Sequence, residues 1–308
     1  MTKRARNQAT SRRDFLTVAS AACLAGMSGE LKGAAQSQQQ TITEFKDLRR
    51  NVGIFTGRGG TIAWFVSKDA VGVVDSMFPD MARVCLDGIA QRSGRRQVDF
   101  LMITHHHMDH TGGNSVFRPV TKRIVAHEKV PELQKLSASQ QQPSEQAVYP
   151  DATFTHTWTC DLGKERAELK HYGPAHTGGD AVIHFHKADV VHMGDLVFNR
   201  RHPYIDKPAG ATITGWIQVL ESVAKEHNKN TIYIFGHAKQ GWSVLGTKAD
   251  LLFQRDYLAA LLDFVKAGVR EGKSQDLIEG ATELLKGFPD HGPLIKRVLQ
   301  AAYAELGG

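Results

Sequence analysis

Four side chains that commonly bind metal ions lie within a window of six residues, directly after an apolar stretch at positions 100–103. They are His105, His107, Asp109 and His110, in the pattern His-x-His-x-Asp-His. Burying histidine and aspartate at this density costs free energy unless a partner offsets their desolvation. A divalent metal ion is such a partner, and imidazole with carboxylate ligands suits zinc. The alternative is a solvated polar loop that is rich in histidine.

The spacing of these four side chains predicts two groups of ligands. In an extended chain, residues i and i+2 point to the same side, so His105 and His107 can hold one ion. Asp109 and His110 lie beyond, where the chain leaves the strand, and can reach a second ion. His106 alternates away from its neighbours, so we expect it to point outward or to support a ligand. The two glycines that follow the motif permit a tight turn and close backbone approach.

Three further candidate ligands lie downstream, each where an apolar, strand-like segment adjoins a turn that contains glycine. These candidates are His176, Asp195 and His237. Together with the first motif, their order and spacing resemble the metallo-β-lactamase superfamily, from about Val52 to about Gly241. The four elements in combination are specific to that pattern, whereas any one of them alone would be only suggestive.

The resemblance implies an α/β (α+β) fold, the four-layer αβ/βα sandwich, with a site for two metal ions at one edge. Two zinc ions are the implied cofactors, with iron or manganese as alternatives. Asp75 matches a position that orients a ligand, although an aspartate at the end of a strand could equally be a turn residue. The implied metal ligands are His105, His107 and His176 for the first ion, Asp109, His110 and His237 for the second, and Asp195 for both.

Two metal ions with a shared carboxylate leave room for a bridging water or hydroxide. Because zinc lowers the pKa of a bound water to roughly 7, no serine or cysteine nucleophile is required. We therefore expect a hydroxide to attack a carbonyl directly, with Asp109 as the catalytic residue that carries a proton to the leaving group. The expected substrate is a small cyclic amide or ester, of the β-lactam or lactone type. Arg200, Arg201 or Lys207 could bind a substrate carboxylate, or they could form an exposed basic loop.

Other chemistries share this fold, so several alternatives stay open. Aspartate at position 195 fits lactonase-like and thioesterase-like relatives better than typical β-lactamases, which keeps a thioester hydrolase as an alternative. Flavo-diiron relatives have a carboxylate where this chain has His107, which disfavours redox chemistry. A nuclease is disfavoured because no large inserted clamp region is evident. A non-catalytic metal-binding or redox relay protein is compatible with the full ligand set.

The first 35 residues have the pattern of a twin-arginine export signal. The stretch Ser11-Arg12-Arg13-Asp14-Phe15-Leu16 resembles the signature, and the apolar run ending at Met27 is too short to span a bilayer of ~30 Å. Small residues at Gly33-Ala34-Ala35 suit cleavage. A cytosolic basic tail is the alternative. We therefore expect a periplasmic or secreted protein that engages the twin-arginine export machinery and has no stable membrane anchor.

Composition sets the remaining expectations. Residues 1–35 hold six basic and two acidic side chains, so they carry +4 of the formal charge of +6. The rest of the chain is close to neutral, which gives no electrostatic case for a nucleic-acid partner and leaves a small-molecule substrate as the expected partner. We expect a flexible segment at 36–50 and a single domain at 51–308 with a helical C-terminal part. The oligomeric state stays open.

The periodicity of apolar residues predicts the elements that position the ligands. The expected strands are 61–66, 98–104, 167–171, 181–186, 190–193 and 231–235. The expected helices are 80–92, 127–136 and 214–227, with a mainly helical region at 247–306 and a loop at 137–150. Strand blocks that alternate twice with helices predict two sheets packed face to face, with helices outside.

Several other residues have simpler interpretations. We expect His184, His186 and His192 to be structural. For His171 and His202, a structural role and a role at the site both stay open. Cys85 has the spacing of a buried helical residue, and neither Cys85 nor Cys160 lies near the ligand motifs.

Overall fold

The computed structural model describes residues 43–58, 60–94, 97–140 and 147–307. The predicted export signal and residues 36–42 of the expected flexible segment lie outside the described residues. The described residues pack together as one unit.

Seven strands form the first sheet, in chain order from β1 to β7. The pairs from β1 to β4 are antiparallel, and those from β4 to β7 are parallel. The antiparallel strands β2 and β3 follow each other directly along the chain as a hairpin. The strands are β1 (Glu44–Arg49), β2 (Val52–Gly57), β3 (Gly60–Val66), β4 (Val71–Val74), β5 (Val98–Met102), β6 (Thr121–His127) and β7 (Ala152–Phe154).

Six strands form the second sheet, in the order β15-β13-β11-β10-β9-β8, and β12 pairs with β14 beside it. The strands β11 and β13 are parallel, so their carboxyl ends lie at the same edge. The strands are β8 (Thr157–Leu162), β9 (Glu165–Lys170), β10 (Val182–Phe185), β11 (Val190–His192), β12 (Phe198–Asn199), β13 (Ile232–Ile234), β14 (His237–Ala238) and β15 (Leu245–Gly246).

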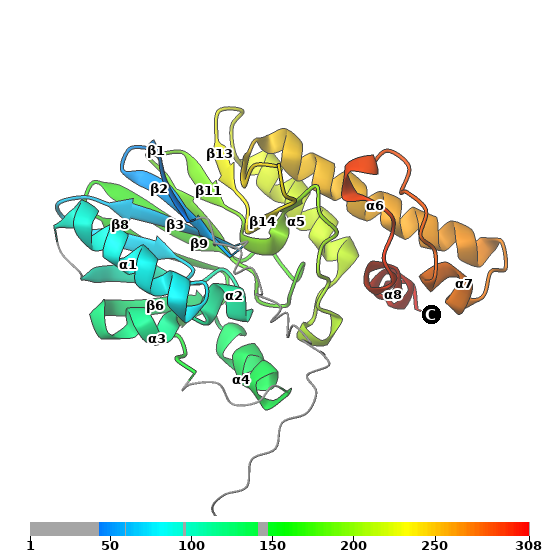
Figure 1. Cartoon of the computed structure of the whole chain (residues 1–308), viewed down its shortest axis with the longest axis horizontal. Helices are drawn as coiled ribbons and strands as arrows, with labels where there is room; N and C mark the ends of the chain where they lie inside the picture. Colours follow the sequence, from blue (N-terminus) through cyan, green and yellow to red (C-terminus); the bar gives the residue numbers. More distant parts are fainter. Residues whose placement is uncertain (1–42, 59, 95–96, 141–146, 308) are drawn as a thin grey trace, which may run out of the picture. The chain divides into compact units, whose positions relative to one another are not determined.

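The helices cover the outer faces of the sheets (Figure 1). None of those in the described part of the chain is both long and apolar enough to cross a membrane. They are α1 (Pro79–Ser93), α2 (Met108–Thr111), α3 (Asn114–Phe117), η1 (Arg118–Val120), α4 (Val130–Gln140), η2 (Gly194–Leu196), η3 (Lys207–Ala209), α5 (Ile213–Glu226), α6 (Lys248–Arg270), α7 (Gln275–Glu279), η4 (Pro289–His291) and α8 (Lys296–Glu305).

Three apolar clusters separate the layers. The central cluster joins the two sheets, with Phe65 of β3 and Met102 of β5 packed together with Phe185 of β10. A second cluster, which includes Cys85, packs α1 on the other face of the first sheet. The third packs α5 and α6 on the second sheet and contains the fully buried Trp216. This arrangement of helix, sheet, sheet and helix confirms the predicted four-layer αβ/βα sandwich.

Two expectations about the elements are wrong. Residues 44–49, expected to be flexible, form the edge strand β1, in which Phe45 packs on Phe55 with ring centroids 4.7 Å apart. Three of its four charged residues, Glu44, Lys46 and Asp47, are exposed, as is common at sheet edges, and this weakens the apolar signal. His127 belongs to β6 rather than to a helix, and α4 begins at Val130 and extends to Gln140. The exposed Lys122 and Arg123 interrupt the apolar pattern of β6.

The two cysteines of the described chain, Cys85 and Cys160, are buried and free. Burial raises the pKa of Cys160 to about 12, so this thiol is unreactive at neutral pH.

Candidate metal centre

The predicted ligands lie where strands of both sheets end. His105 and His107 lie between β5 and α2, Asp109 and His110 lie in α2, Asp195 lies in η2 after β11, and His237 begins β14. His176 lies in the loop between β9 and β10. A backbone hydrogen bond joins the segment before His105 to the end of the loop that holds His176: Ala181 N–H donates to the carbonyl of Thr104 at 2.8 Å. The structure therefore brings all seven predicted ligands to one edge of the sandwich.

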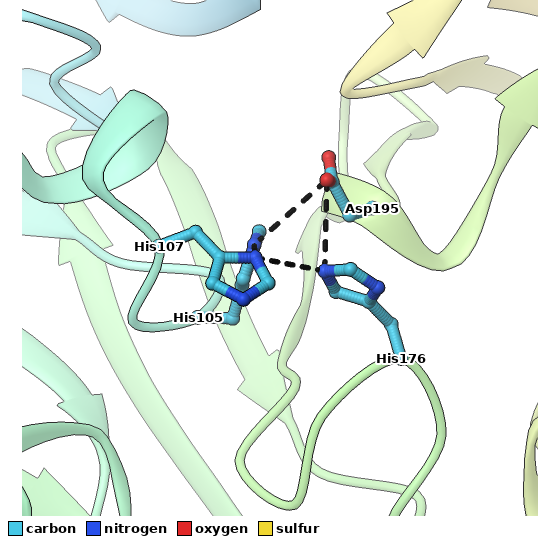
Figure 2. Close-up of side chains that lie close together, drawn as sticks. All are labelled: His105, His107, His176 and Asp195. Carbon is cyan, nitrogen blue, oxygen red and sulfur yellow. Dashed lines mark hydrogen bonds and ion pairs between the residues drawn. The ribbon is translucent and has the colours of Figure 1, made fainter. Parts of the chain in front are cut away.

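The first ligand group consists of three imidazoles and one carboxylate that point toward one another (Figure 2). His107 Nδ1 lies 3.0 Å from His105 Nε2 and 3.1 Å from His176 Nε2. The Oδ2 atom of Asp195 lies 3.9 Å from His105 Nε2 and 3.6 Å from His176 Nε2. A tetrahedral zinc ion with bonds of 2.0–2.1 Å places its ligand atoms about 3.3 Å apart. These spacings therefore fit one ion.

The second group consists of Asp109, His110 and His237. Asp109 Oδ2 lies 3.1 Å from His237 Nε2 and 3.8 Å from His110 Nε2. Asp195 also reaches this group, with Oδ1 at 3.1 Å from His110 Nε2 and Oδ2 at 3.3 Å from His237 Nε2. One carboxylate thus faces both groups, which is the geometry expected of a bridging ligand.

Two buried atoms test whether metal ions fit this arrangement. His110 Nε2 and Asp195 Oδ1 are both buried and lie 3.1 Å apart, yet neither forms a well-oriented hydrogen bond with the other or with any further described residue. Polar atoms left in this state are costly, and a metal ion between them would satisfy both. The donor set of imidazoles and carboxylates suits zinc, and it also suits iron or manganese.

Hydrogen bonds from the opposite ring nitrogens orient three of the histidines. His110 Nδ1 donates to Asp75 Oδ2 at 2.7 Å, His107 Nε2 donates to Asp206 Oδ2 at 2.8 Å, and His176 Nδ1 donates to the Tyr204 carbonyl at 2.7 Å. Such partners set the tautomer and the ring orientation of a metal-binding histidine.

Asp75 plays both roles considered for it. It is buried at the end of β4 with a left-handed backbone (φ 64°), as in a turn, and it orients His110. Its carboxylate also accepts hydrogen bonds from the backbone N–H and the hydroxyl of Thr104, each at 2.8 Å. The same side chain therefore positions the strand end that precedes His105.

Asp206 is a functional residue that the sequence did not reveal. It lies in the loop after β12, where it caps η3 by accepting from Ala209 N–H and also contacts His107. No motif surrounds it, and His107 is 99 positions away along the chain. His106 is buried beside it, with Nε2 at 3.6 Å from Asp206 Oδ2, rather than pointing outward.

The pKa values divide the cluster into neutral and charged parts. Burial, the largest cause, lowers the pKa of His176 to about 3, so this ring offers a lone pair at neutral pH. Burial alone would also lower the pKa of His237, but Asp195 and Asp109 raise it to about 9. Burial raises the pKa of Asp109, but His110 and His237 outweigh it and lower the pKa to about 2. Metal binding to the second group must therefore displace a proton from His237.

Two glycines allow the loops to approach closely. A Cβ atom at Gly236 would lie 2.1 Å from Asp195 Oδ1, which is far inside van der Waals contact. Gly194 has a left-handed backbone (φ 51°), and a Cβ atom there would lie 2.8 Å from the Cβ of Thr104. Both positions precede a predicted ligand, so glycine is part of what places Asp195 and His237.

A pocket of about 400 Å³ opens beside the ligand groups. Asp109, Asp195 and His237 line it. Its apolar lining residues are Met108, Leu136, Phe198, Tyr204, Pro208 and Ala209. Arg201 and Arg297 line it as well. The pocket suits a small molecule that has an apolar body and a negatively charged group.

The three basic residues considered for substrate binding have different surroundings in the structure. Only Arg201 lines the pocket. Arg200 instead packs over the Phe253 ring, with its Cζ 3.5 Å from the centroid. Lys207 forms an ion pair with Glu305 at 2.6 Å. Arg297 of α8 was not predicted, since nothing in its sequence neighbourhood indicates a site.

The other histidines lie outside the two ligand groups. His184 and His186 pack against each other on β10 and the turn after it, with ring centroids 4.3 Å apart, and His192 is buried at the end of β11. His171 stacks on His127 with centroids 4.0 Å apart. His202 is hydrogen-bonded to the Tyr257 hydroxyl at 2.7 Å and to the Pro293 carbonyl at 2.9 Å. It therefore ties the loop after β12 to the C-terminal helices.

Comparison with known proteins agrees with this description. The family model of the metallo-beta-lactamase superfamily matches residues 56–237. The 2,4-dinitroanisole O-demethylase subunit alpha of Nocardioides sp. (strain JS1661) is 29% identical over 126 residues, which is 39% of this chain and 35% of that protein. The metallo-beta-lactamase type 2 of Bacillus cereus is 22% identical over 198 residues, which is 63% of this chain and 73% of that protein.

Solved structures share the fold. A metallo-beta-lactamase from Pontibacter korlensis superposes with a TM-score of 0.58 at 19% identity, over 71% of this chain and 99% of that chain. A stereoselective inverting sec-alkylsulfatase from Pseudomonas sp. superposes with a TM-score of 0.66 at 15% identity, over 85% of this chain and 50% of that chain. The chain thus spans about a third of the demethylase subunit and half of the sulfatase.

The fold and the clustered histidines and carboxylates define a metal-dependent hydrolase built on a two-sheet sandwich. The family model covers more than half of the chain, and the chain belongs to the metallo-β-lactamase superfamily.

Proposed function

We propose that this protein is an exported hydrolase that binds two zinc ions and cleaves a small cyclic amide or ester, of the β-lactam or lactone type, that carries a negatively charged group. The observation that carries the proposal is the position of Asp195, whose two oxygens face both ligand groups at 3.1–3.9 Å. Members of both groups line a pocket that a small molecule can enter: His107 and Asp195 of the first group, and Asp109 and His237 of the second. The likeness to a Bacillus cereus metallo-beta-lactamase over 63% of the chain supports carbonyl chemistry.

The ligand groups determine what chemistry is available. When bound, zinc ions would polarise the substrate carbonyl and lower the pKa of a bound water to about 7. His105, His107 and His176 would hold one ion and Asp109, His110 and His237 the other, while Asp195 would contact both. Asp75 and Asp206 keep the ligand rings in the tautomer that directs a lone pair toward the ions.

Asp109 is the catalytic residue of the proposal. Its side chain is 30% exposed and lines the pocket, whereas Asp195 is 4% exposed. Because its pKa is about 2, Asp109 is ionised at neutral pH and can accept a proton on the pocket side, then return it to a leaving group. Asp109→Asn keeps an oxygen of similar shape but removes the basic carboxylate, so we expect most turnover to be lost. Full activity in a variant that still holds two zinc ions would contradict this role.

The pocket wall explains the charge that we propose for the substrate. Arg201 and Arg297 both line the pocket, and so do three aspartates, Asp109, Asp195 and Asp206. A substrate with a carboxylate would place it at the arginines and its reacting carbonyl at the ligand groups. Replacing Arg201 by alanine should raise KM for such a substrate more than it lowers kcat.

Hydrolysis assays test the function directly. Zinc-loaded protein would be given a chromogenic cephalosporin, an acyl-homoserine lactone and a thioester, each with a matched chelated sample. Turnover of the cephalosporin or the lactone that is lost on chelation would support the proposal. Turnover of the thioester alone would replace the substrate class. No turnover of any of the three, in protein shown to hold two zinc ions, would refute it.

Export is part of the proposal and has its own test. Residues 1–35 would be fused to a fluorescent reporter that folds in the cytoplasm, since the twin-arginine route carries folded proteins. The fusion should reach the periplasm, and the pair Arg12→Lys and Arg13→Lys should keep it in the cytoplasm. Equal localisation of the two fusions would contradict a twin-arginine signal.

A further inference from the structure

A second pocket, of about 350 Å³, lies next to the one that opens onto the metal centre. We call it the cationic pocket. Four basic residues line it, and the residues of the described chain that line it include no carboxylate. These four residues are Arg200, Arg201, Lys239 and Arg297. Asp250 and Asp290 each lie 3.9 Å from Arg200, too far for a strong ion pair, and neither of them lines the pocket.

His291 is the second observation that points to a ligand here. It lines the cationic pocket and is 6% exposed, yet neither ring nitrogen has a hydrogen-bond partner among the described residues. Its ring is held in place by stacking on Tyr257, with centroids 4.2 Å apart and planes 11° apart. Buried polar atoms usually have partners, so an imidazole without one indicates a group that the protein itself does not supply.

The electrostatic state of His291 favours an anion. Burial, followed by the charges of His202, Arg200 and Lys239, lowers the pKa of His291 to about 3. The ring is therefore neutral at physiological pH and can donate one N–H. His202 is already hydrogen-bonded at both ring nitrogens, so it positions the loop rather than a ligand. Positive charge from the four basic residues with a neutral donor is the chemistry that binds carboxylate, sulfate or phosphate groups.

The cationic pocket adjoins the metal centre through shared residues. Arg201 and Arg297 line both pockets. His237 lines the first pocket, and Ala238 and Lys239, which follow it, line the second. In extended chain, positions 237 and 239 lie roughly 7 Å apart. One molecule of modest length can therefore reach from the ligand groups to the cationic pocket.

We propose that the cationic pocket binds the anionic end of the substrate, a carboxylate, sulfate or phosphate, while the bond to be cleaved lies at the metal centre. This inference rests on the proposed hydrolase function and specifies its substrate as an elongated anionic ester or amide. Lys239 and His291 are then specificity-determining residues that touch the substrate far from the reacting bond.

The first arm of the test measures binding without chemistry. Sulfate, as the probe, would be titrated calorimetrically into zinc-loaded protein. Lys239→Ala removes an exposed charge and should weaken sulfate binding about three- to tenfold, because a charge-assisted hydrogen bond is lost at a partly exposed site. Lys225→Ala removes an exposed lysine of α5 that lines neither pocket and is the matched control. Equal affinity in the two variants, or no sulfate binding, would overturn the proposal.

The second arm measures specificity. The anionic ester mono-para-nitrophenyl glutarate should have a higher kcat/KM than neutral para-nitrophenyl butyrate, and Lys239→Ala should reduce that ratio about three- to tenfold. A ratio that does not change would show that the anion bound is not part of the substrate and would overturn the proposal. If neither ester is cleaved by zinc-loaded protein while sulfate binding depends on Lys239, the hydrolase function fails and the anion site stands.

Discussion

Replacing Asp206 by asparagine should weaken one metal site and leave the other nearly unchanged. His107 donates to Asp206 from Nε2 at 2.8 Å, while its Nδ1 lies 3.0–3.1 Å from the ligand atoms of His105 and His176. Burial by itself raises the pKa of Asp206, but the hydrogen bond from His107 outweighs it and holds the pKa below its usual value. The carboxylate is therefore ionised, and it increases the electron density that His107 can offer an ion.

The size of the effect follows from the geometry. Losing the outer partner of a metal-binding histidine typically costs 10–100-fold in affinity, or about 1.4–2.7 kcal/mol. Asp206 accepts from His107 with Oδ2 and from Ala209 N–H with Oδ1, so the single amide oxygen of asparagine can keep the bond from His107 only at the expense of the cap of η3. We therefore expect Asp206→Asn to reduce metal affinity about tenfold, near the lower end of this range, and Asp206→Ala to reduce it by an amount near the upper end.

Competition with a zinc chelator would measure the two site affinities, with Asp161→Asn, an exposed change on β8, as the control. Affinity should fall for the ion held by His105, His107 and His176. Unchanged affinity at both sites would refute the reasoning, and so would a loss confined to the site of His110. Asp75→Asn is the counterpart, because Asp75 orients His110 at 2.7 Å, and it should weaken the second site instead.

Three further predictions test the packing and the charges around the site. Gly236→Ala places a Cβ atom 2.1 Å from Asp195 Oδ1. The variant should therefore bind less metal and lose at least tenfold in activity, with little change in circular dichroism. Normal metal content in this variant would contradict the proposed clash. Burial raises the pKa of Glu305, but hydrogen bonds from Lys207 and Thr212 outweigh this effect and lower the pKa from 4.5 to about 2. The stability that the ionised Glu305 contributes is therefore present above pH 4.5 and is lost as the pH falls toward 2. Glu305→Gln should therefore lower Tm by a few degrees at neutral pH and hardly at all near pH 2, and an equal loss at both would argue against the ion pair. Chelation should lower Tm, because ions that bind only the folded chain stabilise it by mass action, and zinc should restore it; a Tm that does not respond would indicate that the site binds no metal.

Much of the fold could be predicted because local patterns agree with the tertiary structure. Apolar runs that end in ligand motifs predicted β5, β11 and β13, and the spacing of apolar residues predicted α1 and α5 within two residues. Edge strands carry a weaker signal, since one face and one edge meet solvent and charged residues are tolerated there. The expectation that residues 44–49 are flexible failed for that reason. Only pairing with β2 makes this stretch a strand.

From the sequence alone, the spacing of His105, His107, Asp109 and His110 predicted two groups of ligands, because metal chemistry restricts the residue types and short spacing restricts which of them can share an ion. The other three predicted ligands, His176, Asp195 and His237, came from the resemblance to the metallo-β-lactamase superfamily. Tertiary structure alone decided what surrounds them. Asp206 meets His107 across 99 positions, and Arg297 of α8 lines the same pocket as Arg201 of the loop after β12. Such contacts have no local pattern, since the side chains are brought together only when the two sheets and the C-terminal helices pack.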